Sequence, residues 1–196
     1  MTIEYTSPYG ISSFEDFNKL NKAFVDKTEF INVIDKLDSP YPVLLRPRRF
    51  GKTTFVQMLL CFYDISFKDK YDEIFKGTKI LEMNLPSHNS YHVIKFDFSG
   101  ISGTNVESLI TNFNQKVSVG INDFLIRYPD FEFSNDYTGR DPANFIDEFF
   151  KTFARYSKSK SLYILIDEYD NFANDVLSND RDLFKTITQS NGFLKD

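Results

Sequence analysis

Apolar residues recur at helical spacing in several stretches of the chain. The clearest stretch runs from Lys52 to Tyr63, where apolar residues occupy positions i, i+3, i+4 and i+7 and predict an amphipathic helix. Those residues are Phe55, Met58, Leu59 and Phe62. Similar spacing predicts helices over 28–37, within 106–128 and within 142–157, and Asp26 or Thr28 is available to cap the first of these.

Short apolar runs alternate with these helices. The runs PVLLR (42–46), HVIKFDF (92–98) and SLYILIDEYD (161–170) are too short for helices and predict buried strands. Strands that alternate with long helices are typical of a parallel sheet covered on both faces. The sequence therefore predicts a three-layer α/β/α fold with a mainly parallel sheet.

Length and composition are those of one globular domain. A chain of 196 residues can build one core, and no repeat or low-complexity linker divides it, so a single domain over 1–196 is expected. The formal charge of −5 opposes a surface that coats nucleic acid generally. No apolar run is long enough to span a bilayer. The single cysteine, Cys61, suggests core packing in a reducing compartment, so a cytoplasmic location is expected.

The stretch RPRRFGKT, residues 46–53, ends like a phosphate-binding loop between a predicted strand and a predicted helix. Gly51 lets the backbone approach a phosphate, Lys52 supplies a compact positive charge, and the Thr53 hydroxyl can bind Mg²⁺. The free N–H groups of the following helix point at the same anion. Arg46 stands where the G-x-x-x-x-G-K-[ST] pattern has its first glycine, which leaves a basic surface turn as the alternative.

An acidic pair, Asp167 and Glu168, follows the apolar part of the last predicted strand. In phosphate-transfer sites such an aspartate holds Mg²⁺, and the next glutamate can orient and deprotonate the attacking water. Ligand sites of parallel sheets form beyond the carboxyl ends of strands, where Lys52 and this pair are both expected. Taken alone, RPRRFGKT could be a basic surface turn, and the acidic pair could belong to an acidic loop without a catalytic role. The two motifs together favour a nucleotide site. Asp97, at the end of another strand, fits a strand-end cap better than a metal ligand.

Five blocks of the sequence, in this order, resemble the AAA-ATPase-like family. They are PYGISSFEDF, FVDKTEFI, VLLRPRRFGKTTF, VIKFDFSGI and LYILIDEYD, and they span residues 8–171. The resemblance implies a P-loop NTPase fold of the additional-strand type, with ATP and Mg²⁺ as ligands. The resemblance implies that an arginine at the position of Arg46 is common in the family. It also implies that FVDKTEFI lies near the nucleotide base. Family members typically carry a PD-(D/E)XK nuclease-like module after the ATPase domain.

The resemblance also implies roles for individual residues. The residues expected to bind nucleotide are Arg48, Arg49, Phe50, Gly51, Lys52, Thr53 and Thr54. For Arg48 and Arg49 a pairing with carboxylates or a solvated position is the alternative, and for Arg49 it is at least as well supported. The resemblance assigns Mg²⁺ to Thr53 and Asp167, and it makes Lys52 and Glu168 the catalytic residues, with Glu168 activating the water.

The chain departs from the family pattern after LYILIDEYD. Residues 178–196 suffice for one helix, so the domain is expected to be truncated there, without the sensor strand or a nuclease module. Self-association or a C-terminal partner module would supply the missing parts, and nucleic acid enters only through the family association. The leading hypothesis is an ATP-binding domain that hydrolyses ATP in the complete protein. The alternative is a non-catalytic module that binds nucleotide or another protein.

Overall fold

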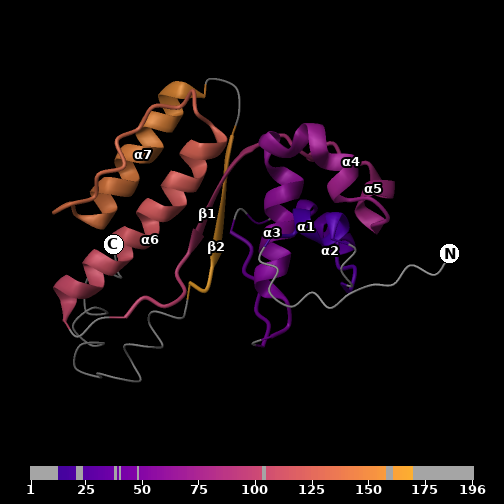
Figure 1. The fold of residues 1–196 in the computed structure, drawn as a ribbon, viewed down its shortest axis with the longest axis horizontal. Coiled ribbons are helices and arrows are strands. Elements are labelled where there is room, and N and C mark those ends of the chain that lie inside the picture. Colours follow the sequence, from indigo (N-terminus) through magenta and orange to yellow (C-terminus); the bar gives the residue numbers. More distant parts are fainter. Residues whose placement is uncertain are drawn as a thin grey trace. The chain divides into compact units, whose positions relative to one another are not determined.

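The structure, a computed structural model, describes residues 13–20, 24–37, 39, 41–47, 49–102, 105–157 and 161–169. Helices and a small parallel two-stranded sheet make the chain an α/β protein (Figure 1). The chain divides into two units, Met1–Val93 and Ile94–Asp196. At this level the fold class predicted from the sequence is confirmed.

The described part of the first unit consists mainly of helices, and α3 is the longest of those described. In chain order they are α1 (Glu15–Lys19), α2 (Glu29–Asp35), α3 (Lys52–Tyr63), the 3₁₀ helix η1 (Ile65–Lys70), α4 (Tyr71–Ile74) and α5 (Lys79–Met83). The bounds of α3 are those that its apolar spacing predicts. Phe62 of α3 is fully buried, with its ring against those of Tyr63, Tyr71 and Phe75. These edge-to-face aromatic contacts hold α3 against α4.

The described part of the second unit contains a two-stranded sheet and two long helices. In chain order the elements are β1 (His92–Asp97), whose first two residues end the first unit, then α6 (Val106–Arg127), α7 (Pro142–Tyr156) and β2 (Leu162–Asp167). All fall within the ranges that the sequence predicts. Local capping explains where the helices begin, because Asn105 and Ser108 form a capping box before α6 and Asp141 caps α7.

Helix α6 lies directly against β1 at Gly120. A Cβ atom there would stand 2.6 Å from both the Lys95 carbonyl oxygen and Cδ1 of Phe96, so only glycine fits this approach without a shift. Helix α7 packs along α6 (Figure 1) through a cluster of aromatic rings. The cluster centres on Phe124, which is fully buried among Tyr128, Phe131, Phe149 and Phe153.

Residues 42–47 form no strand, so the prediction of a buried strand over 42–46 is wrong. They have no regular secondary structure, and Val43 and Leu45 are 65% and 75% exposed. A strand persists only when a neighbouring strand satisfies its backbone hydrogen bonds. Among the described residues, β1 and β2 pair with each other and leave this run without a partner strand. The prolines that bound the run also lack the N–H groups that a sheet requires.

Strand β2 is covered on one face. Leu165 and Asp167 are buried, whereas Ile164 and Ile166 are 43% and 48% exposed. Alternate residues of a strand point to opposite faces, so the two isoleucines share the open face. The strand itself is confirmed, but the prediction of a sheet buried on both faces is wrong at β2.

Two expectations about the chain concern residues outside the part that the structure describes. The single domain over 1–196 and its helix within 178–196 stay predictions, because residues 170–196 lie outside the described part of the chain. Within the described part, no helix combines the length and the apolar character needed to cross a membrane.

Candidate functional site

The turn into α3 has the backbone geometry that an anion-binding loop requires. Gly51 is the N-cap of α3 and lies in the left-handed region, with φ 76° and ψ 29°. Glycine adopts this conformation without strain and carries no side chain that could cap the helix. Within the described residues, no N-cap side chain occupies the N–H groups at the start of α3, which lie at the positive end of the helix dipole and can bind an anion.

The predicted phosphate-contact residues occupy this turn and the first turn of α3. Lys52 and Thr54 are half-buried and Thr53 is exposed, so their side chains can reach a ligand in solution. Before them, Arg49 has a positive φ of 68°, and Phe50 is 57% exposed. The remaining predicted member, Arg48, lies outside the described residues.

Lys27 joins this turn from an earlier part of the sequence. Its Nζ donates a hydrogen bond to the Phe50 carbonyl oxygen over 3.1 Å. The same Nζ lies 3.7 Å from the point where a Cβ atom on Gly51 would stand. Sequence reasoning placed the FVDKTEFI block near the nucleotide base and named no contact for Lys27. Lys27 and Phe50 are too far apart in the sequence for a periodic pattern to link them. The only sequence signal for this contact is that FVDKTEFI and the loop occur together in the family pattern.

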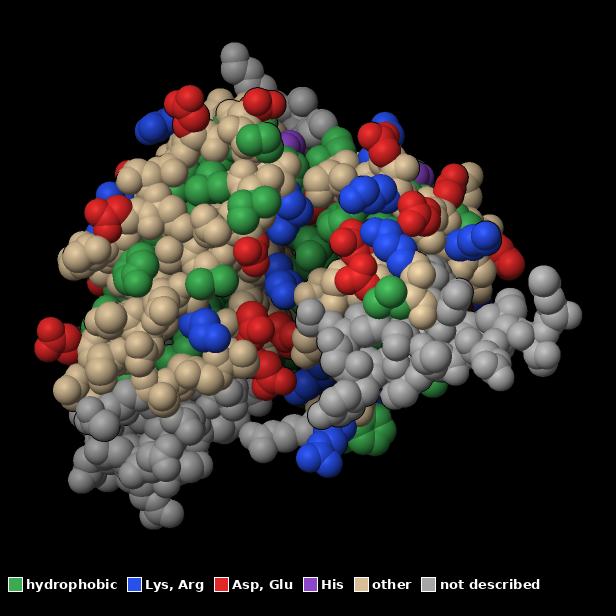
Figure 2. Space-filling model, in the orientation of Figure 1, with side chains coloured by type: hydrophobic (Ala, Val, Ile, Leu, Met, Phe, Trp, Pro, Cys, Tyr) green, Lys and Arg blue, Asp and Glu red, His purple; other side chains and the backbone are tan. Residues whose placement is uncertain are grey.

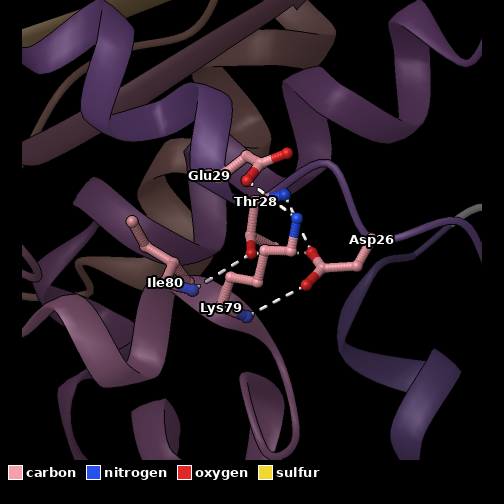
Figure 3. A network of polar contacts seen from close by, with 5 residues as sticks. All are labelled: Asp26, Thr28, Glu29, Lys79 and Ile80. Atoms are coloured by element: carbon pink, nitrogen blue, oxygen red, sulfur yellow. Dashed lines mark hydrogen bonds and ion pairs between the residues drawn. The ribbon is translucent and has the colours of Figure 1, made fainter.

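A network of polar contacts holds the backbone on both sides of Lys27 (Figure 3). The Asp26 carboxylate accepts hydrogen bonds from the Thr28 hydroxyl at 2.7 Å and from the Lys79 backbone N–H at 2.9 Å. The Thr28 hydroxyl accepts in turn from the Ile80 N–H at 3.2 Å. Lys79 Nζ pairs with Glu29 at 2.8 Å. Asp26 and Thr28 thus bind the start of α5. Asp26 also accepts a hydrogen bond from the Thr28 N–H at 2.9 Å, at the start of the helix predicted over 28–37, whereas Thr28 makes no side-chain cap there.

The network predicts how the stability of the first unit depends on Asp26. Burial by itself raises the pKa of this carboxyl, but hydrogen bonds from Lys79 and Thr28 outweigh burial and hold the pKa below its ordinary 3.8. We expect Asp26→Asn to lower the free energy of unfolding by about 1–3 kcal/mol near neutral pH. Because the pKa of Asp26 is lower in the folded than in the unfolded chain, its ionised carboxylate stabilises the folded state at pH values above the unfolded pKa. This stabilisation is lost as the pH falls through the folded pKa.

Urea unfolding followed by circular dichroism measures this effect. The free energies of unfolding of the unmutated chain and of Asp26→Asn should become more similar as the pH falls from about 5 to about 2. Glu73→Gln, which removes an exposed carboxylate from α4, is the matched control. A difference that stays constant over this pH range would contradict an ionised Asp26 in the folded chain.

The acidic pair lies at the end of β2 in the second unit. Asp167 is 4% exposed, and its Oδ1 accepts a hydrogen bond from the Glu168 N–H at 3.1 Å. The Asp167 carbonyl oxygen accepts from the Phe98 N–H at 3.1 Å, which continues the pairing with β1. Glu168 has a positive φ of 54° and is half-buried. The left-handed backbone conformation of Glu168 turns the chain out of the strand. The carboxylates of Asp167 and Glu168 therefore point into different environments.

Asp97 ends β1, at the same end of the parallel sheet as Asp167. Its Oδ1 accepts a hydrogen bond from the Ser99 N–H at 2.9 Å, which is the strand-end cap that the sequence favoured. Burial by itself raises the pKa of Asp97, but the Ser99 hydrogen bonds and the charges of Lys116 and Lys95 lower it overall. Asp97 is therefore held in its ionised form.

Each unit carries an oxygen donor of a kind that Mg²⁺ can bind. No group of three or more His, Cys, Asp or Glu side chains gathers within the described residues. Mg²⁺ usually takes one or two carboxylates, with phosphates and water as its other ligands. The buried Asp167 carboxylate and the exposed Thr53 hydroxyl are oxygen donors of that kind. Their assignment to one metal ion stays a prediction.

On the face of the first unit that Figure 2 draws, the surface charges are mixed. Figure 2 shows basic and acidic side chains standing beside one another over its helices rather than one extended basic field. The ion pair of Lys79 with Glu29 is one such case.

Comparison with known proteins adds one finding. A family model described as "Predicted AAA-ATPase" matches residues 8–196, nearly the whole chain, and it is the family that the sequence motifs indicate. Neither the curated proteins nor the solved structures yielded a match.

Proposed function

The chain belongs to the AAA-ATPase-like family, and from this membership we propose that it binds ATP with Mg²⁺ through residues 46–54. The observation that carries the proposal is the left-handed Gly51 at the N-terminus of α3, directly before Lys52 and Thr53. A glycine followed by lysine and threonine at a helix N-terminus is what a P-loop needs, and this supports the proposal. A P-loop NTPase fold of the additional-strand type, over one domain of residues 1–196, is part of the same proposal.

Each residue of the loop has a distinct role in binding. The Lys52 ammonium binds the β and γ phosphates, and the N–H groups at the start of α3 bind phosphate oxygens. The Thr53 hydroxyl holds Mg²⁺, and Thr54 adds the next N–H and hydroxyl of the helix. Arg48, Arg49 and Phe50 form the loop before them. ATP rather than GTP rests on the family, since the sequence has no guanine-reading N-K-x-D segment.

The proposed reaction is hydrolysis of the bond between the β and γ phosphates. Glu168 orients a water molecule and accepts its proton as the water oxygen attacks the γ phosphorus. The β–γ bridging oxygen leaves with ADP, and inorganic phosphate is the second product. Asp167 holds the metal shell, and Lys52 stabilises the negative charge that develops on the phosphates. Bound Mg²⁺ supplies further neutralisation of that charge.

Calorimetric titration with ATP and Mg²⁺, together with phosphate release in the same samples, tests the proposal. We expect the unmutated chain to bind and Lys52→Ala to bind about 10- to 100-fold more weakly, the loss of a charged hydrogen bond. Lys68→Ala, which removes an exposed lysine from η1, is the matched control and should bind normally. A folded chain that binds no ATP, or equal binding by Lys52→Ala, would overturn the nucleotide site.

Partners and location complete the proposal. The proposed partners are a second copy of the chain or a C-terminal module, and the exposed side chains of Ile164 and Ile166 on β2 offer apolar surface for such a contact. A cytoplasmic location and any action on nucleic acid rest on sequence and family alone.

A further inference from the structure

Lys27 places a second ammonium group at the proposed phosphate loop. Its Nζ lies 3.1 Å from the Phe50 carbonyl oxygen and 3.7 Å from the Cβ position of Gly51, so its charge stands beside the turn that precedes Lys52. We propose that Lys27 is a phosphate-binding residue and that the ATP polyphosphate links residues 24–29 to the start of α3. This inference rests on the proposed function, because it adds a residue to the same nucleotide site.

The backbone that carries Lys27 is anchored independently of any ligand. Asp26 and Thr28, its neighbours on either side, bind the first N–H groups of α5, and Thr28 is fully buried. Two anchored neighbours restrict where the Lys27 side chain can reach, which reduces the conformational entropy lost when it binds a ligand. The sequence Asp-Lys-Thr thus combines two side chains that fix α5 with one that reaches the loop.

The chemistry of the Lys27 ammonium suits a phosphate better than its present partner. An ammonium group has three N–H donors, and Lys27 gives one to a neutral carbonyl. None of the ion pairs found among the described residues involves Lys27. Charge-assisted hydrogen bonds to phosphate are roughly twice as strong as neutral ones. Its remaining donors can therefore bind a phosphate oxygen while the bond to Phe50 is kept.

A purely structural role predicts a different response to substitution. If Lys27 serves to tie the loop to residues 24–29, an uncharged donor such as the glutamine amide should replace it in part. If it binds phosphate, the positive charge is required, and arginine should replace it better than glutamine. The pair Lys27→Gln and Lys27→Arg therefore separates a structural tie from phosphate binding.

The experiment is calorimetric titration of the full chain and its variants with MgATP. We expect Lys27→Gln and Lys27→Met to bind about 10- to 100-fold more weakly than the unmutated chain. Lys27→Arg should stay within about threefold, because it keeps the charge. Lys68→Gln, which removes a lysine remote in sequence from the loop, should bind as the unmutated chain does. Thermal unfolding of each variant checks that it is folded, and two neutral variants allow for one that is not.

The outcomes separate this inference from the function on which it rests. If MgATP binding is lost in Lys52→Ala but unchanged in Lys27→Gln and Lys27→Met, the loop binds nucleotide without Lys27 and the inference is overturned alone. Equal loss in the glutamine and arginine variants would also overturn it, by showing that the lysine acts as a structural tie. If the unmutated chain binds no MgATP, the proposed function fails, and the inference fails with it.

Discussion

Glu168→Gln is expected to retain MgATP binding and to lower the rate of phosphate release by about 100- to 10,000-fold. Glutamine keeps the size of the side chain and an acceptor oxygen, but it does not accept a proton from the attacking water. Glu168 turns out of β2 at a positive φ, so the substitution leaves the paired part of the strand intact. Calorimetric titration gives the affinity, and phosphate release under saturating MgATP gives the rate.

Two comparisons make this result specific. Glu132→Gln removes an exposed carboxylate from the same unit and should release phosphate at the unmutated rate. Asp167→Asn should instead weaken the dependence of binding on Mg²⁺, because Asp167 is assigned to the metal. Undiminished turnover in Glu168→Gln would remove Glu168 from the mechanism. If the unmutated chain binds MgATP and releases no phosphate, the hydrolysis proposal is overturned for this chain, and a nucleotide-binding module takes its place.

Phe124→Ala is expected to lower the free energy of unfolding by about 3–5 kcal/mol, the usual cost of truncating a fully buried phenylalanine. Phe124 has no exposed surface and joins α6 to α7 through its contacts with Phe149 and Phe153. Its removal loses apolar burial and leaves a cavity among rigid rings that cannot all move to fill it. Total stabilities are only about 5–15 kcal/mol, so much of the unit's stability depends on this side chain.

Urea unfolding followed by circular dichroism measures the change. Ile126→Ala, two residues along the same helix and 71% exposed, is the control and should cost about 0.5 kcal/mol or less. Phe124→Leu should fall between the two, since it keeps part of the apolar volume. Similar losses in Phe124→Ala and Ile126→Ala would contradict a dominant contribution of the aromatic cluster to the stability of this unit.

The candidate loop shows which parts of a site can be predicted from sequence. Gly51, Lys52 and Thr53 are consecutive, and the helix that begins at Lys52 follows from local spacing. Their geometry is therefore encoded within a few residues. The contact from Lys27 joins residues 23 positions apart, and the binding of Asp26 to Lys79 joins residues 53 apart. Such contacts depend on how helices pack, which no local pattern specifies.

The strands show the same division. HVIKFDF and the last apolar run form β1 and β2, where each meets a parallel partner. The run over 42–46 is as apolar as these, yet it forms no strand in the structure. Apolar composition favours burial, but strand formation also needs a neighbour with matching hydrogen bonds. The sequence pattern shows which runs are apolar, but it does not show which of them have a neighbouring strand to pair with.

By itself the sequence determined the long helices α3, α6 and α7, the loop chemistry before α3, the acidic end of β2 and the family. Helices are predictable because their backbone hydrogen bonds close within four residues and their buried faces repeat with the helical period. Only the tertiary structure decided that Lys27 reaches the loop, that Asp26 and Thr28 bind α5, and that one face of β2 stays open. These features depend on contacts between residues distant in sequence, and those contacts form only when the chain packs.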